Sequence, residues 1–122
     1  MLANKARTGR LGEDLACRYL RSNGYKIIDR NYRKAWGELD IIAISPSKIL
    51  VFVEVKTING PGNIISPEEQ VTGEKKKKLN KIAQYYANRV RDRDISKNGW
   101  RIDLIAITIE AGSATIKHYK NI

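Results

Sequence analysis

Apolar residues recur at helical spacing in two segments of the chain. In residues 5–24 they are Leu11, Leu15, Ala16, Tyr19 and Leu20, and Gly24 follows where a helix would stop. The second segment begins at Ser66-Pro67-Glu68-Glu69, which has the residue types of a helix N-terminus, and should run to about Arg91. Its inner stripe consists of Leu79, Ile82, Ala83, Tyr86, Ala87 and Val90. The pattern therefore predicts two amphipathic helices.

Five segments have the alternating or continuously apolar pattern of β-strands. They are residues 25–35, Glu38–Ile44, Ile49–Thr57, Trp100–Ile109 and Ala114–Tyr119. The first is polar and predicts an edge strand, and the next two should form a hairpin, whereas residues 58–63 and 92–98 predict connections. Because a helix separates residues 52–55 from 101–105, these strand cores should be parallel neighbours. The prediction is one α/β domain over residues 1–122, with a mixed sheet and the order α-β-β-β-α-β-β.

Composition narrows the class of protein. The 122 residues carry a net charge of +10 with one Cys and one His, which excludes an internal disulfide framework and a Cys/His zinc site. No stretch is long and apolar enough for a membrane span and no signal peptide begins the chain, so we expect a cytoplasmic protein with no membrane partner. Residues 1–34 carry +6 and residues 75–101 carry +8, but residues 35–74 carry −4. The acidic middle is therefore the candidate for chemistry.

The predicted hairpin brings several charged side chains together. If Pro46-Ser47-Lys48 forms a three-residue turn, the numbers of opposed residues add up to 94. Asp40 then faces Glu54, and Glu38 faces Lys56. Alternation also places Phe52, Glu54 and Lys56 on one face of their strand.

Three interpretations fit these charges. They could be solvated or bridged to nearby Lys and Arg at a strand end, or Glu38 and Lys56 could form an ion pair while Asp40 caps a turn. In the third, two close carboxylates and a backbone carbonyl form a hard-oxygen site suited to Mg²⁺ or Mn²⁺. A neighbouring ammonium then positions or activates water and stabilises the charge that develops at phosphorus.

A wider set of motifs accompanies the Asp40…Glu54-Val55-Lys56 pattern and covers nearly the whole chain. They are Thr8-Gly9-x-x-Gly12-Glu13, Gly24-Tyr25, Arg30-Asn31-x-Arg33, Gly37-Glu38-Leu39-Asp40, Val53-Glu54-Val55-Lys56-Thr57, Val71-Thr72-x-x-Lys75 and Arg101-Ile102-Asp103. Together they resemble the YraN-like family of small uncharacterised bacterial proteins. That family is similar to Holliday-junction resolvases and other members of the PD-(D/E)XK, or restriction-endonuclease-like, superfamily.

The resemblance implies a restriction-endonuclease-like central mixed sheet flanked by helices. It also implies that Asp40, Glu54 and the Val55 carbonyl bind the metal, that Lys56 is the catalytic lysine, and that Glu13 adds a carboxylate from the first helix. The function hypothesis is a Mg²⁺- or Mn²⁺-dependent nuclease acting on DNA, including branched or junction DNA. A non-catalytic nucleic-acid-binding module and a basic adaptor for an acidic protein are the alternatives. A homodimer would suit a branched substrate.

Charged and aromatic residues outside the carboxylate pattern also have predicted roles. For nucleic-acid contacts we expect Arg10, Arg33, Lys75 and Lys78. One or two lysines of the run Lys75 to Lys78 can point at a common target, and Lys75 is the first candidate. Gly37 either permits a phosphate to approach or marks a bend, and Arg101 and Asp103 form either an ion pair or a substrate contact. The remaining predictions treat Trp36, Tyr25 and Tyr32 as packing residues, Cys17 as small core filler and His118 as a surface residue.

Overall fold

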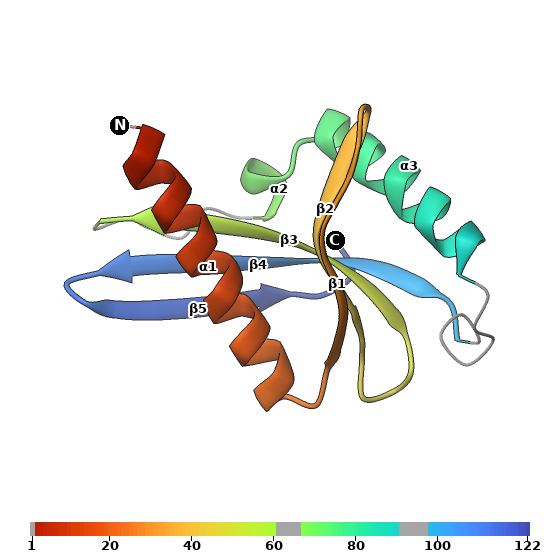
Figure 1. Ribbon diagram of the computed structural model, residues 1–122, viewed down its shortest axis with the longest axis horizontal. Helices are drawn as coiled ribbons and strands as arrows, with labels where there is room; N and C mark the ends of the chain where they lie inside the picture. Colours follow the sequence, from red (N-terminus) through yellow and green to blue (C-terminus); the bar gives the residue numbers. More distant parts are fainter. Residues whose placement is uncertain (1, 61–66, 91–97) are drawn as a thin grey trace.

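The computed structural model describes residues 2–60, 67–90 and 98–122 (Figure 1). Its helices are α1 (Leu2–Ser22), the single turn α2 (Pro67–Gln70) and α3 (Gly73–Arg89). Its strands are β1 (Lys26–Lys34), β2 (Gly37–Ile44), β3 (Leu50–Asn59), β4 (Trp100–Glu110) and β5 (Ser113–Tyr119). Apart from the extra turn α2, this is the predicted α/β order.

The five strands form one mixed sheet in the order β1-β2-β3-β4-β5. Strands β3 and β4 are parallel and the other neighbours are antiparallel. The polar strand β1 is an edge, as predicted, and its register against β2 shifts between Ile27 and Asp29. The predicted parallel pairing is also confirmed, because Phe52 lies opposite Ile102 and Val55 opposite Ile105.

The hairpin turn has the predicted length. The Ser45 amide donates to the Ile49 carbonyl oxygen at 2.9 Å, so Pro46, Ser47 and Lys48 form the loop. Lys48 adopts a φ of 67°, the left-handed conformation that closes a three-residue hairpin. The residue numbers of each opposed pair add up to 94, from Ile41 with Val53 to Ile44 with Leu50. The predicted register is confirmed over that stretch.

Each face of the sheet is covered by one helix (Figure 1). On one face, α1 packs Ala16, Cys17 and Leu20 against residues such as Ile41 and Val53, so Cys17 is the predicted core filler. On the other, α3 packs its buried residues Leu79, Ile82 and Ala83 against residues such as Phe52 and Leu104. None of the helices described is long and apolar enough to cross a membrane.

The second predicted helix is wrong as a continuous element. The helix breaks at Thr72, whose side-chain oxygen accepts a hydrogen bond from the Lys75 amide at 3.3 Å and so caps a new helix. Val71, in the break, is buried beneath α3. The predicted cap Ser66 and most of the two predicted connections lie outside the described residues.

Candidate metal site and nucleic-acid interface

The candidate site lies where β2 separates from β3. The paired residues of this hairpin end at Ile41 and Val53, so Asp40 is the first residue beyond the ladder. Its side chain takes the place of a strand partner, because Asp40 Oδ2 accepts a hydrogen bond from the Val55 amide at 2.8 Å. The N–H and C=O groups of one strand residue point to the same side. The Val55 carbonyl therefore faces the same gap as Asp40.

Asp40 and Glu54 act on each other electrostatically. Burial, and after it the nearby negative charge of Glu54, raise the pKa of Asp40 to about 7, although the hydrogen bond from the Val55 amide opposes the rise. Weaker contributions come from Glu13 and Glu38. Two carboxylates held this close in a half-buried gap favour either a proton or a cation between them.

Glu54 and Lys56 point away from α1. Val53 and Val55 pack on the α1 side and Phe52 on the α3 side, so alternation places Glu54 and Lys56 on the α3 side with Phe52. The Glu54 carboxylate is 13% exposed and forms an ion pair of 2.9 Å with Lys75 Nζ, in the first turn of α3. Lys75 is thus the lysine that reaches the site. Lys56 is exposed.

The hairpin register does not extend to Glu38. The predicted partner of Glu38 was Lys56, but Glu38 lies opposite Arg33 of β1 and contacts the Arg33 guanidinium at 3.4 Å. Both side chains are exposed. The reason is the separation of β2 from β3, which leaves the N-terminal part of β2 paired with β1 alone.

Glu13 approaches from the opposite face on α1. The helix comes very close to β3 here, because a Cβ on Gly12 would lie 1.8 Å from Thr57 Oγ1. The Glu13 carboxylate is 3.9 Å from the Arg30 guanidinium, which makes a closer contact of 2.8 Å with Asp14. Within the described ranges, no three His, Cys, Asp or Glu side chains come close enough together to hold a metal ion. The close carboxylate pair is therefore Asp40 and Glu54, with Glu13 apart from it.

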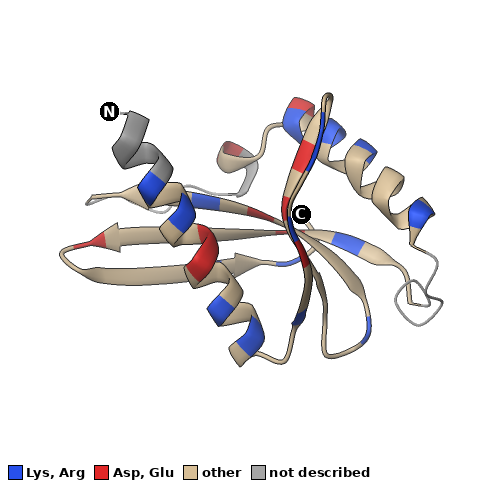
Figure 2. Cartoon of the chain, viewed as in Figure 1, with Lys and Arg blue, Asp and Glu red and all other residues tan. Residues whose placement is uncertain are grey.

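Basic residues flank the acidic strands. Figure 2 shows Lys and Arg along α1 and α3, with acidic residues on β2 and β3 between them. A groove of about 690 Å³ between α1 and β1 is lined by Arg10, Glu13, Arg30 and Arg33, among others. Two of the predicted nucleic-acid contacts, Arg10 and Arg33, thus share one groove with Glu13. Lys78 is exposed on α3.

The aromatic residues predicted to pack do so unequally. Tyr25 is buried, and Tyr32 packs edge-on against Tyr86 with ring centroids 5.0 Å apart. Trp36 is 38% exposed and stacks edge-on against Tyr85. The prediction that Trp36 is mainly a packing residue is thus only partly confirmed. A Cβ on Gly37 would lie 3.5 Å from Ile82 Cδ1, which is an ordinary van der Waals contact, so Gly37 faces α3 without crowding that would require a glycine.

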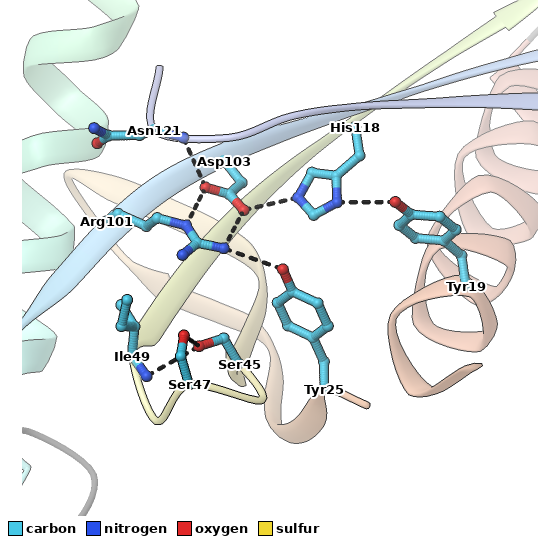
Figure 3. A network of polar contacts seen from close by, with 9 residues as sticks. All are labelled: Tyr19, Tyr25, Ser45, Ser47, Ile49, Arg101, Asp103, His118 and Asn121. Carbon is cyan, nitrogen blue, oxygen red and sulfur yellow. Dashed lines mark hydrogen bonds and ion pairs between the residues drawn. The ribbon is translucent and has the colours of Figure 1, made fainter. Parts of the chain in front are cut away.

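A second polar cluster joins Arg101 and Asp103 to His118 and Tyr19, two members that the sequence did not predict (Figure 3). The Asp103 carboxylate is completely buried and pairs with Arg101 at 2.9 Å. Of the two alternatives for these residues, the ion pair is therefore confirmed. The prediction of a surface His118 is wrong. Its side chain is 5% exposed, and its Nε2 lies 2.7 Å from Asp103 Oδ2 while its Nδ1 lies 3.0 Å from the Tyr19 hydroxyl. The alternation of β5 next to β4 turns this residue inward.

Several bacterial proteins are similar to this chain over most of its length. The UPF0102 protein of Desulforamulus reducens is 40% identical over 115 residues, covering 93% of this chain and 92% of that protein. The UPF0102 protein of Rhodococcus jostii is 40% identical over 121 residues, covering 98% of each chain. Among solved structures, Pyrococcus furiosus SfsA in complex with Ca²⁺ aligns with 17% identity and a TM-score of 0.35. That alignment covers 95% of this chain but only 63% of SfsA.

The profile of an uncharacterised protein family matches residues 12–107, which include α1 from Gly12 on and the strands that bear Asp40, Glu54 and Asp103. The long matches to proteins of that family agree with the profile. They also agree with the resemblance to YraN-like proteins. The chain belongs to the uncharacterised protein family UPF0102.

Proposed function

We propose that this protein is a metal-dependent nuclease acting on DNA, with branched or junction DNA as its preferred form. The observation that carries the proposal is the gap between β2 and β3. There Asp40 is held by the Val55 amide next to Glu54, and burial together with the negative charge of Glu54 raises the pKa of Asp40. Surface carboxylates with no shared role have little physical reason to be held in this way.

The donor set suits a hard divalent cation. Asp40, Glu54 and the Val55 carbonyl offer oxygen ligands from two adjacent strands, and Mg²⁺ typically takes one or two carboxylates and completes its shell with water and substrate oxygens. Such an ion, when bound, supplies Lewis-acid activation of the scissile phosphodiester. Glu13 approaches the site from α1 but would need a shift, or a bridging water, to take part.

The two lysines have different roles in this proposal. Lys75 already neutralises Glu54 through the 2.9 Å ion pair and is the group that a bound cation has to replace. Lys56 is exposed on the same face of β3, two residues after Glu54. Its ammonium orients the water that attacks phosphorus and stabilises the negative charge that develops there.

The charge distribution supports a polyanionic substrate. The net charge is +10, and the excess of basic residues lies on the segments that bear α1 and α3. The groove lined by Arg10 and Arg33 is also lined by Glu13. Phosphate contacts of this kind hold a nucleic acid without reading its sequence. A substrate recognised by its shape fits this surface better than a substrate recognised by its bases.

The test is cleavage of linear, flapped and four-way-junction DNA with Mg²⁺ or Mn²⁺. Asp40→Asn, Glu54→Gln and Lys56→Met should each lower the rate at least about a hundredfold. Glu38→Gln is the matched control, because it makes the same chemical change on the same strand at an exposed residue paired with Arg33. Its rate should stay close to that of the wild type.

A separate measurement follows the cation directly. Mn²⁺ titration monitored by electron paramagnetic resonance should detect a site in the wild type that Asp40→Asn removes and Glu38→Gln keeps. If no DNA form is cut and no site is detected, but DNA affinity falls with salt at a slope of about −0.9 per neutralised phosphate, the protein is a non-catalytic binding module. Equal cutting by all variants would rule out this site as the active centre.

A further inference from the structure

A second cavity lies at the other end of the β2–β3 hairpin, near the C-terminal end of α1. Its volume is about 300 Å³, at the small end of the range for sites that take small molecules. The turn that holds Ser45 and Ser47 forms one part of its wall, and Tyr25, Arg101 and Lys120 form others. Figure 3 shows the Arg101 guanidinium, the Tyr25 hydroxyl and this turn close together.

The acidic group next to this cavity is already saturated. Asp103 Oδ1 accepts hydrogen bonds from Arg101 Nε and the Asn121 amide, both at 2.9 Å. Asp103 Oδ2 accepts from Arg101 Nη2 at 3.3 Å and binds His118 Nε2 at 2.7 Å. Each carboxylate oxygen thus has two partners, and Asp103 is completely buried. Asp103 therefore holds Arg101 and His118 in place and has no free capacity for a ligand.

The groups left over are hydrogen-bond donors. Arg101 Nη1 has no hydrogen-bond partner in the described part of the chain, and it is not among the buried polar atoms that lack one, so it is accessible on a residue that lines the cavity. The Tyr25 hydroxyl accepts from Arg101 Nη2 at 3.1 Å, which leaves its own hydrogen free. Ser45 Oγ accepts from the Ile49 amide and shares one hydrogen bond with Ser47 Oγ. Ser45 and Ser47 have two hydroxyl hydrogens between them, and the bond between the two residues uses one, so the other can be donated to a ligand.

The wall of the cavity carries positive charge. Among the described residues that line the cavity there is no Asp or Glu, and Lys120 takes part in no ion pair recorded for the described chain. The side-chain amide nitrogen of Asn23 donates to the Tyr19 carbonyl oxygen at 2.8 Å, which leaves the Asn23 side-chain oxygen as an acceptor. A guanidinium, an ammonium and two hydroxyl donors around a small volume are complementary to a tetrahedral oxyanion.

We infer that this cavity binds a phosphate monoester group, through Arg101, Tyr25, the Ser45–Ser47 turn and Lys120. The group comes either from a free phosphate or nucleotide, or from the terminal phosphate of a nucleic-acid strand. The inference goes beyond the proposed nuclease. Ser45 directly follows β2 and is five residues from Asp40, which is roughly 16 Å along a strand, so the two sites are separate.

The experiment is calorimetric titration with inorganic phosphate and with adenosine monophosphate, in EDTA and at constant ionic strength. The wild type should bind saturably, and amide NMR signals of the Ser45–Ser47 turn should shift. Lys120→Gln and Tyr25→Phe should weaken binding roughly three- to tenfold. Lys117→Gln is the matched control, because it removes the same charge from an exposed residue of β5 outside the cavity wall. It should bind like the wild type.

The source of the phosphate is distinguished with two oligonucleotides of one sequence, one with a 5′-phosphate and one with a 5′-hydroxyl. Tighter binding of the 5′-phosphate strand than of the 5′-hydroxyl strand identifies a strand end as the ligand, and equal binding of the two strands alongside saturable binding of inorganic phosphate identifies the free anion. The absence of saturable binding of inorganic phosphate and of adenosine monophosphate, or equal weakening by Lys117→Gln, would overturn the inference. Asp40→Asn should bind phosphate normally, so failure of the nuclease proposal leaves this test unaffected.

Discussion

Replacing Gly12 by Ala tests how tightly α1 is seated on the strand that carries the candidate site. The new Cβ would lie 1.8 Å from Thr57 Oγ1 and 3.0 Å from Thr57 Cβ, where ordinary van der Waals contact begins at 3.4 Å. The helix and strand must therefore separate by up to about 1.6 Å, or Thr57 must change rotamer. A β-branched side chain on a central strand has little freedom to do so.

The magnitude follows from a comparison within the same helix. Gly9 lies one turn earlier, and a Cβ there would meet no atom within 4 Å. Both substitutions gain the same helix propensity, roughly 1 kcal/mol, so their difference isolates the clash. Overpacking costs about 1–3 kcal/mol. With an unfolding entropy of about 2.1 cal/mol/K per residue, 122 residues convert 1 kcal/mol into roughly 4 °C, so Gly12→Ala should melt about 4–12 °C below Gly9→Ala.

Thermal unfolding followed by circular dichroism measures this difference directly. Adding Thr57→Ala to both variants should reduce the gap, because the nearest clashing atom is removed and the two positions are coupled only through that contact. Two variants with equal melting temperatures would refute the close approach of α1 to β3. Since Glu13 and Lys56 are the chain neighbours of Gly12 and Thr57, DNA cleavage should fall in Gly12→Ala even at temperatures where it stays folded.

Three further predictions concern charge. Lys75→Met should raise the Mn²⁺ affinity about three- to tenfold, because it removes the cation that competes for Glu54, whereas Lys76→Met next to it should have no effect in the same titration. Hydrogen bonds from Arg101, His118 and the Asn121 amide hold the pKa of Asp103 below 3.8 against the opposing effect of burial, so this stabilisation is complete above pH 3.8 and is lost as the pH falls through the lower folded value. Asp103→Asn should cost about 3–5 kcal/mol in urea unfolding at neutral pH and flatten the acid limb of the stability curve. Arg10→Gln should weaken all DNA forms alike and reduce the salt slope of log K by about 1, which titrations at several salt concentrations would show.

The hairpin register could be predicted because it depends on local features alone. Pro46-Ser47 limits the turn, and the apolar residues on either side must face the core, so few alignments of the two strands remain. Four observed pairs agree with the predicted alignment. Beyond Ile41 the prediction stops working, because the separation of β2 from β3 depends on how β1 and α3 hold the start of β2. That information is spread over distant parts of the chain.

The break in the second helix and the burial of His118 were missed for related reasons. Thr72, like Ser66, is a residue type that caps helices, and a local pattern does not say which cap is used when both precede the same apolar stripe. His118 is buried by partners that lie 15 and 99 residues away in the chain. A polar strand residue opposite an apolar one, such as His118 opposite Ile105, is the signal that could have found it.

The irregular edge strand β1 limits how copies of this protein can assemble. A strand edge invites pairing with another chain unless charge or a bulge disrupts it. Here β1 has a register shift between Ile27 and Asp29, and Asn31 adopts a φ of 53°. Arg30, Arg33 and Lys34 add repulsion between two such edges. Continuation of the sheet from one molecule to the next, whether in a dimer or in an aggregate, is therefore blocked at β1 and has to run through β5.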